Sequence, residues 1–407
     1  MIRKLVLSAL ITLIGAFVGL AQSGDAERYD DLSTPYFDHG SGVGITAPDS
    51  SYQMNMRFRI QNRVTYSDGD NRDESINAAI QRLRLRFSGF VADPRLQYDL
   101  QLSFAPGDFR DPDNVNLVKD AVVSYRPTDN WRVIFGQTKL PGNRQYVNSS
   151  ASLQLSDRTL NSSDFAIRRD FGVQLHFLRE DENRPSFNIK TAVSTGNGTN
   201  WLSQSDTDLA YTAQLELFPF GAFQRGGHYF EGDLVRERSP KLLLSGAYHY
   251  NAGAQRERGQ SGSELDHKID LMSLFLDGIL KYRGFSLQAA FMMRDMDDDY
   301  GPVLVMPGAE ENLYPHLGFG LDYQLSYLFR NDIELIGRYS YQQPDEDSLA
   351  NVIFPKRDQV TFGITRYIRD HSVKLQSEVG TELQRYPQIH RGGQTGWYGR
   401  FQVEIGI

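Results

Sequence analysis

The stretch from Tyr52 to Val91 constrains the fold most, because its apolar and polar residues alternate with a period of two. In the first half, up to residue 66, one set of alternate positions carries almost only apolar or aromatic residues. The positions between them are polar and include Arg57, Arg59 and Arg63. Because a strand directs successive side chains to opposite faces, this segment predicts a strand with one apolar and one basic face.

The second half of the stretch repeats the pattern after a polar segment, residues 67–75, which we expect to form a loop. Arg82, Arg84 and Arg86 alternate there with leucine and phenylalanine, so the two halves predict a hairpin. A soluble β-sandwich would bury the apolar face of this hairpin in a protein core. A barrel in a membrane would turn the same face toward lipid and leave the arginines in water.

Composition narrows the classes of function open to the chain. Its 407 residues include no cysteine, which excludes disulfides and thiolate metal sites, and nothing in the sequence indicates a cofactor. The net charge of -8 argues against a general affinity for nucleic acid, which needs a basic surface. Beyond the N-terminus no apolar run is long enough for a membrane helix, although strands of about ten alternating residues can also span a membrane.

The first 21 residues have the features of a secretory signal peptide. Arg3 and Lys4 precede an apolar run, and small residues lie at the expected cleavage site after Ala21. The alternative for this segment is a membrane anchor. We expect residues 22–51, which are polar and weakly periodic, to form a periplasmic N-terminal segment. The mature chain should therefore leave the cytoplasm.

Alternating segments continue through residues 52–407 and give a tally of about 16 strands. An even number of strands and an alternation of short turns with long loops are typical of an all-β, transmembrane antiparallel barrel of the outer membrane. The last strand ends on the apolar Ile407. One connection, residues 219–240, is long where a short turn is expected. We predict that residues 52–407 form a multi-pass outer-membrane barrel in contact with lipid.

A barrel of this size leaves an aqueous channel, so its inward residues set selectivity. The hairpin should bring its six inward arginines side by side; they are Arg57, Arg59, Arg63, Arg82, Arg84 and Arg86. Arginine presents a rigid fork of donors that suits phosphate and carboxylate, and a column of such forks can replace the hydration shell of an anion stepwise. We interpret these residues as an anion-conducting stripe. The alternative is that acids such as Asp99, Asp120 and Glu216 balance them across the lumen.

The long polar segment from Lys139 to Arg169 follows the fifth predicted strand. A loop of this length in a compact barrel has a function or is disordered. Folding into the lumen to narrow it would be such a function, and a solvated outer loop is the alternative.

Several motifs resemble the phosphate-selective porin O and P family. They are Lys-Asp-Ala-Val-Val-Ser-Tyr-Arg-Pro at 119–127, Gly-Gln-Thr-Lys at 136–139, Ser-Asp-Arg at 156–158 and Arg-Asp-Phe-Gly-Val-Gln at 169–174. The resemblance implies a homotrimer of 16-stranded barrels with a long third loop folded into the pore. It further implies a ladder of arginines that leads anions such as phosphate to the constriction, with Arg158 and Arg169 on the loop and Lys139 at its root.

Together these observations predict a passive outer-membrane porin that prefers anions, phosphate or polyphosphate among them. A general, non-selective porin is the nearest alternative. A barrel enzyme would need a catalytic group at the rim, and His176, His249 and His371 lie in no recognisable motif. A binding or adhesion barrel would use its acidic loops, such as the one around Asp295 and Asp297.

Overall fold

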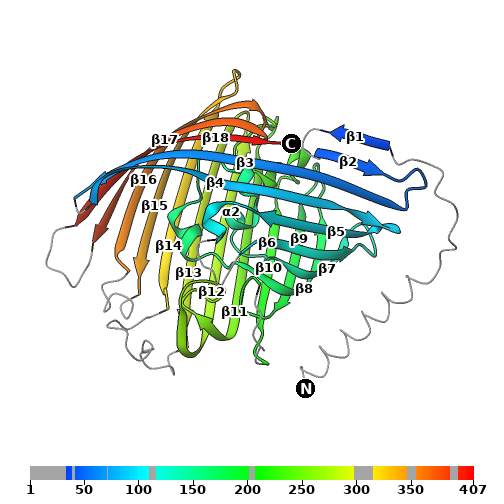
Figure 1. The fold of residues 1–407 in the computed structure, drawn as a ribbon, viewed down its shortest axis with the longest axis horizontal. Helices are drawn as coiled ribbons and strands as arrows, with labels where there is room; N and C mark the ends of the chain where they lie inside the picture. Colours follow the sequence, from blue (N-terminus) through cyan, green and yellow to red (C-terminus); the bar gives the residue numbers. More distant parts are fainter. Residues whose placement is uncertain are drawn as a thin grey trace.

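The computed structural model describes residues 34–38, 42–70, 72–109, 116–200, 207–297, 315–345, 354–385 and 393–407. They form one antiparallel sheet of 18 strands, in which β3 to β18 close into a 16-strand barrel because β18 pairs with β3 (Figure 1). The closing register runs from Gly396 opposite Gly69 to Gly406 opposite Arg59. The predicted fold class and strand number are confirmed.

The strands are β1 (Thr34–Asp38), β2 (Gly42–Thr46), β3 (Tyr52–Gly69), β4 (Arg72–Val91), β5 (Asp93–Ser103), β6 (Val118–Tyr125), β7 (Trp131–Lys139), β8 (Arg169–Arg179), β9 (Ser186–Ser194), β10 (Ala210–Phe218), β11 (Lys241–Arg256), β12 (Glu264–Tyr282), β13 (Phe285–Met296), β14 (Gly318–Leu328), β15 (Ile333–Pro344), β16 (Lys356–Arg369), β17 (Val373–Arg385) and β18 (Gln394–Gly406). The helices are η1 (Pro106–Phe109), α2 (Arg144–Val147), η2 (Ser150–Ser152), α3 (Leu160–Asp164) and η3 (Gln224–Tyr229).

The two faces of the wall differ as the alternation predicts. On β3, Met54, Phe58 and Val64 are exposed on the outside of the barrel, whereas Gln61 and Arg63 are buried on the inside. On the opposite side of the barrel, β10 alternates buried and exposed residues along its whole length. The outer surface is therefore apolar, as a wall in contact with hydrocarbon requires. Among the described residues, no helix is long and apolar enough to cross a membrane.

Two boundaries differ from the sequence-based prediction. The predicted loop over residues 67–75 is wrong, because β3 and β4 stay paired until Gly69 lies opposite Arg72. Residues 22–51 include β1 and β2, and β2 pairs with the first residues of β3, so the sheet begins before residue 52. Residues 1–21, the predicted signal peptide, lie outside the described residues.

The connections place two long segments against the inside of the wall. One is the connection between β7 and β8, from Lys139 to Arg169, which carries α2, η2 and α3. It is the third connection at the end of the barrel opposite the short turns, after those between β3 and β4 and between β5 and β6, and we call it the third connection. The connection between β10 and β11, residues 219–240, carries η3 and lies at the end of the barrel that otherwise has short turns, such as that between Tyr282 and Phe285. Figure 1 shows α2 within the outline of the barrel.

Candidate functional site

The six predicted arginines all face the interior of the barrel from β3 and β4, and we call them the arginine wall. Antiparallel pairing places Arg57 opposite Arg86 and Arg59 opposite Arg84, so these four lie in two adjacent rows. A bulge follows Gln61, which lies opposite Arg82. A β-bulge inserts one extra residue into one strand. Arg63 therefore lies opposite Ala79 rather than an arginine.

The part of the arginine wall toward the start of β3 borders open space. A cavity of about 260 Å³ is lined by Arg57, Arg59, Arg84 and Arg86 on one side, and by the third connection around Ser149 and Ser152 on the other. In the described residues, Nη1 of Arg84 is buried and has no hydrogen-bond partner. This cavity is where the barrel offers an ion several guanidinium groups at once.

Further along β3, toward its turn with β4, the arginine wall is bound to the third connection. Arg63 donates to Oδ2 of Asp157 at 3.0 Å, and Arg82 donates to its Oδ1 at 3.1 Å. Arg59 donates to Oγ of Ser150 at 2.8 Å. Burial would raise the pKa of Asp157, but the charges of Arg82 and Arg63 lower it well below its usual range. Asp157 is therefore ionised and holds the loop against the wall.

The three remaining predicted site residues lie around the third connection. Arg169 forms a two-bond pair with Asp120, at 3.0 and 2.9 Å. Lys139 donates to the carbonyls of Val147 and Asn148, and Arg158 donates to three carbonyls of residues 145–148. Lys139 and Arg158 thus brace the loop backbone, a role that the motif alone did not indicate.

Tyr146 lies in the middle of these bases. Its ring centroid is 5.0 Å from Arg158 Cζ, 5.1 Å from Arg168 Cζ and 5.7 Å from Lys139 Nζ, within the range of cation–π contacts. Burial would raise the pKa of Tyr146, but the neighbouring arginines, above all Arg168, lower it to about 8. Sequence reasoning did not single out this residue.

Sequence reasoning also gave no role to Lys119 or to Asp108, the acid that Lys119 shares with Arg84. Lys119 bonds to Asp108 at 2.6 Å, and Arg84 lies 3.7 Å from the same carboxylate. Lys119 and Asp120 both point inward although they are consecutive, because a bulge on β6 separates the residues opposite Gln101 and Leu102. A strict period of two assigns only one of two consecutive residues to the inner face, so it cannot predict that both face inward. The signal in the sequence that could have indicated Lys119 is the acidic loop next to it, which contains Asp108.

The opposite wall, formed by β9 to β17, is packed against the third connection. Arg144 is almost fully buried and pairs with Glu216 of β10, which Lys190 also contacts at 2.8 Å. Gln154 donates to Ser326 Oγ and Glu334 Oε1, and its carbonyl accepts from Thr365 and Gln376. Several inward polar residues of this wall thereby form hydrogen bonds with the loop.

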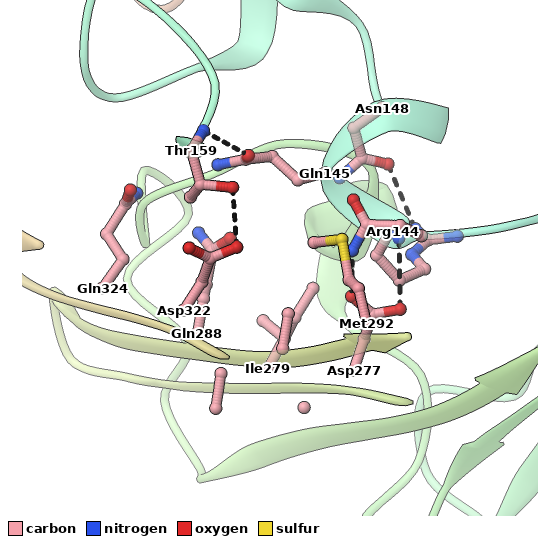
Figure 2. A pocket seen from close by; sticks show the side chains of 14 residues that line it. Arg144, Gln145, Asn148, Thr159, Asp277, Ile279, Gln288, Met292, Asp322 and Gln324 are labelled. Atoms are coloured by element: carbon pink, nitrogen blue, oxygen red, sulfur yellow. Dashed lines mark hydrogen bonds between the residues drawn. The ribbon is translucent and has the colours of Figure 1, made fainter. Parts of the chain in front are cut away.

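Figure 2 shows how closely the loop contacts this wall. The backbone N–H of Arg144 donates to Asp277 at 3.2 Å, and Thr159 Oγ1 donates to Asp322 at 2.7 Å. The cavity between them holds only about 30 Å³, roughly the space of a single water molecule. Gly320 permits this approach, because a Cβ there would lie 2.1 Å from the side chain of Asn161. The loop and this wall are therefore in close contact around Asp277 and Asp322.

Residues 54–224 match the sequence model of the phosphate-selective porin O and P family, which confirms the resemblance drawn from the motifs. No curated protein matches the chain. The fold is similar to that of several solved outer-membrane channels. The anion-selective porin from Comamonas acidovorans matches with a TM-score of 0.52 and 13% identity, over 87% of this chain and 100% of that one.

Two further structures match over similar lengths. The outer-membrane channel DcaP of Acinetobacter baumannii has a TM-score of 0.54 and 12% identity, over 88% of this chain and 99% of that one. The trimer form of OmpT from Vibrio cholerae has a TM-score of 0.50 and 11% identity, over 86% of this chain and 99% of that one. At these identities the likeness concerns the fold. With the family match and the apolar outer face, it identifies the chain as an outer-membrane porin, a channel that spans the membrane many times.

Proposed function

We propose that this porin conducts anions in preference to cations, along the arginine wall, and that phosphate is among the anions it passes. The observation that carries the proposal is the cavity shared by Arg57, Arg59, Arg84 and Arg86 next to the third connection. Guanidinium groups in adjacent rows give an anion successive donors of similar strength, so that it can enter and leave. The name of the family and the anion selectivity of the similar Comamonas porin are consistent with this preference.

The acids near the arginine wall are too few to cancel it. Asp157 serves Arg63 and Arg82, and Asp108 serves Arg84 and Lys119. Glu404 contacts both Arg59 and Lys374. Asp99 pairs with Arg86 of the wall, as the balancing alternative expects. The other three carboxylates are each shared between two cations, so the cations here outnumber the four acids. The local charge therefore stays positive, which favours anions in the adjoining water.

The double substitution Arg57→Gln and Arg84→Gln tests this proposal. Two charges at a range of roughly 8 Å are worth about 1 kcal/mol in water, so the ratio of anion to cation permeability should fall about fivefold. The ratio follows from the reversal potential of reconstituted protein in a gradient of potassium chloride. Arg330→Gln, an exposed arginine on the turn between β14 and β15, is the matched control. An unchanged ratio in the double variant rejects the arginine wall as the selective element.

Phosphate preference is tested by titrating phosphate into chloride during single-channel recording. A saturable block of the chloride current at low phosphate supports a binding site in the wall. A current that only follows the bulk ion composition favours the alternative, a general non-selective porin. The barrel enzyme remains a weaker candidate, since His249 bonds to Thr212 and Gln260, and His371 bonds to a main-chain carbonyl and Lys374.

We further propose that the chain is exported by a signal peptide cut after Ala21, that residues 22–51 are a periplasmic segment ahead of the barrel, and that three copies assemble. The trimer form of the similar OmpT fold is consistent with that assembly. N-terminal sequencing of protein from outer membranes tests the cleavage site. Native mass spectrometry in detergent tests the number of chains.

A further inference from the structure

The connection between β10 and β11, residues 219–240, folds inward from the end of the barrel that carries the short turns. In outer-membrane barrels this end faces the periplasm. The segment begins on an apolar cluster with the wall, formed by Phe218, Ala222, Phe223, Leu243 and Ile279. Its position is therefore fixed by packing as well as by polar contacts.

Hydrogen bonds from a lysine and an arginine tie this connection to the wall. Nζ of the buried Lys281 donates to the carbonyls of Gly227, Phe230 and Gly232. Arg236 donates to the carbonyl of Leu328, at the end of β14, at 2.9 Å. Such charge-assisted bonds are stronger than bonds between neutral groups, so the segment is anchored on both β12 and β14.

Glu231 joins the segment to the third connection. Its carboxylate accepts from Gln145 Nε2 and from the backbone N–H of Gln154, both at 2.8 Å. Its own N–H donates to the carbonyl of Ser152 at 2.9 Å. The carbonyl of His228 accepts from Arg144 at 2.7 Å. The two inward segments are thus one hydrogen-bonded body that fills the side of the lumen facing β10 to β17.

The remaining space at this end lies next to the arginine wall. A cavity of about 270 Å³ is lined by Ser152, Arg225, Phe230, Leu234 and His371. It shares Ser152, His371 and Ser372 with the cavity of about 260 Å³ that the arginines line. The segment turns its acids away from this space: Asp233 accepts from Gly284 N–H, and Glu237 accepts from Gln224 N–H. The charged side chain that the segment places in the cavity is the exposed Arg225. Arg369 and Asp370, at the end of β16, also line this cavity.

From these contacts we propose that residues 219–240 form a second constriction, entered from the periplasmic end, which fixes the third connection and confines ions to the arginine wall. Arg225 extends the basic path to the periplasmic exit. The preference for anions in this inference rests on the proposed function. The narrowing of the lumen rests on the geometry alone. It adds to the third loop a partner element from the opposite end of the barrel.

Replacing residues 221–240 by Asn-Gly tests the constriction. Since Leu217 lies opposite Leu244, this change closes the hairpin without a shift of register. We expect single-channel conductance to rise by about twofold or more, and the anion preference to fall toward unity. Wild-type conductance and selectivity in a variant that retains the barrel, judged by circular dichroism and heat-modifiable mobility, would overturn the proposal.

A second experiment tests the constriction without shortening the chain, and it applies even if the shortened chain does not fold. Because the chain has no cysteine, Leu234→Cys introduces a single thiol in the cavity, and Ser239→Cys places one on the exposed end of the segment. A methanethiosulfonate reagent should lower the conductance of the first variant by about half and leave the second unchanged. Complete labelling at Leu234→Cys, verified by mass, with no loss of current would overturn the proposal.

The two proposals can fail separately. If the wild-type porin shows no anion preference, the proposed function fails, while a rise in conductance on shortening still supports the constriction. If Arg225→Glu leaves the selectivity of an anion-preferring wild type unchanged, the basic exit path is wrong. Arg238→Glu, an exposed arginine of the same segment, controls for the change of charge.

Discussion

The arginine wall on β3 and β4 and the opposite wall on β9 to β17 carry equally polar inward residues, yet they are used differently. Arg59 and Arg84 keep 13% and 16% of their side-chain surface exposed beside open cavities, whereas Lys374 and Glu216 keep none. The buried charges of the opposite wall are paired with the third connection or with residues 219–240 and do not face open space. Inward polarity alone therefore does not identify the residues that meet permeating ions.

The difference has an energetic meaning. A buried charge is costly unless its partners satisfy it, so each charge of the packed wall depends on a specific neighbour. A charge beside water keeps part of its solvation and can exchange a protein partner for an ion. We expect substitutions in the packed wall to affect stability first, and substitutions in the arginine wall to affect selectivity first.

The largest expected effect is the loss of Glu216. Glu216→Ala leaves Arg144 and Lys190 without their shared buried carboxylate, which should cost about 3–5 kcal/mol of stability. The free energy of unfolding in urea, followed by circular dichroism in detergent, measures it. Glu264→Ala removes the carboxylate of an exposed pair with Arg256 and should cost less than about 1 kcal/mol. Equal costs would contradict the expectation that a buried charge of the packed wall depends on a specific neighbour.

A smaller effect is expected where the loop meets the arginine wall. Asp157→Asn removes the carboxylate shared by Arg63 and Arg82 and adds one positive charge to the wall. The ratio of anion to cation permeability should rise about twofold, since one charge at roughly 8 Å is worth about 0.5 kcal/mol in water. Reversal potentials test this, with Asp93→Asn in the exposed pair with Arg95 as the control. A fall in the ratio would mean that Asp157 acts mainly by holding the loop.

The sequence alone was sufficient to predict the strands of the barrel wall and their two faces. It was not sufficient to predict the contacts of the segments inside the barrel. Alternation along Tyr52 to Val91 places the arginines correctly, because strand geometry ties sequence parity to the side of the sheet. The same rule fails at Lys119, where a bulge turns two consecutive residues inward. It also cannot separate Arg144, buried against Glu216, from Arg169, since both are basic residues of one polar segment. Their roles depend on contacts between residues far apart in sequence.

The smallest expected effect concerns Tyr146, which couples the loop bases to pH. Burial raises the pKa of this phenol, but Arg168 and its neighbours lower it to about 8, so the phenolate forms as the pH rises above that value. The phenolate adds a negative charge among Lys139, Arg158 and Arg168. With a pKa of about 8, the ionised fraction rises from about a tenth at pH 7 to about nine tenths at pH 9. Anion preference should therefore fall by slightly less than the factor of about two that one full charge at roughly 8 Å gives in water.

Tyr146→Phe keeps the ring over the three cations and removes the titrating hydroxyl. Its anion preference should stay constant between pH 7 and 9, while the wild type declines. Reversal potentials at fixed salt across this range compare the two. A parallel decline in both proteins would assign the pH dependence to other groups, and would place Tyr146 with the packed side of the lumen rather than with the arginine wall.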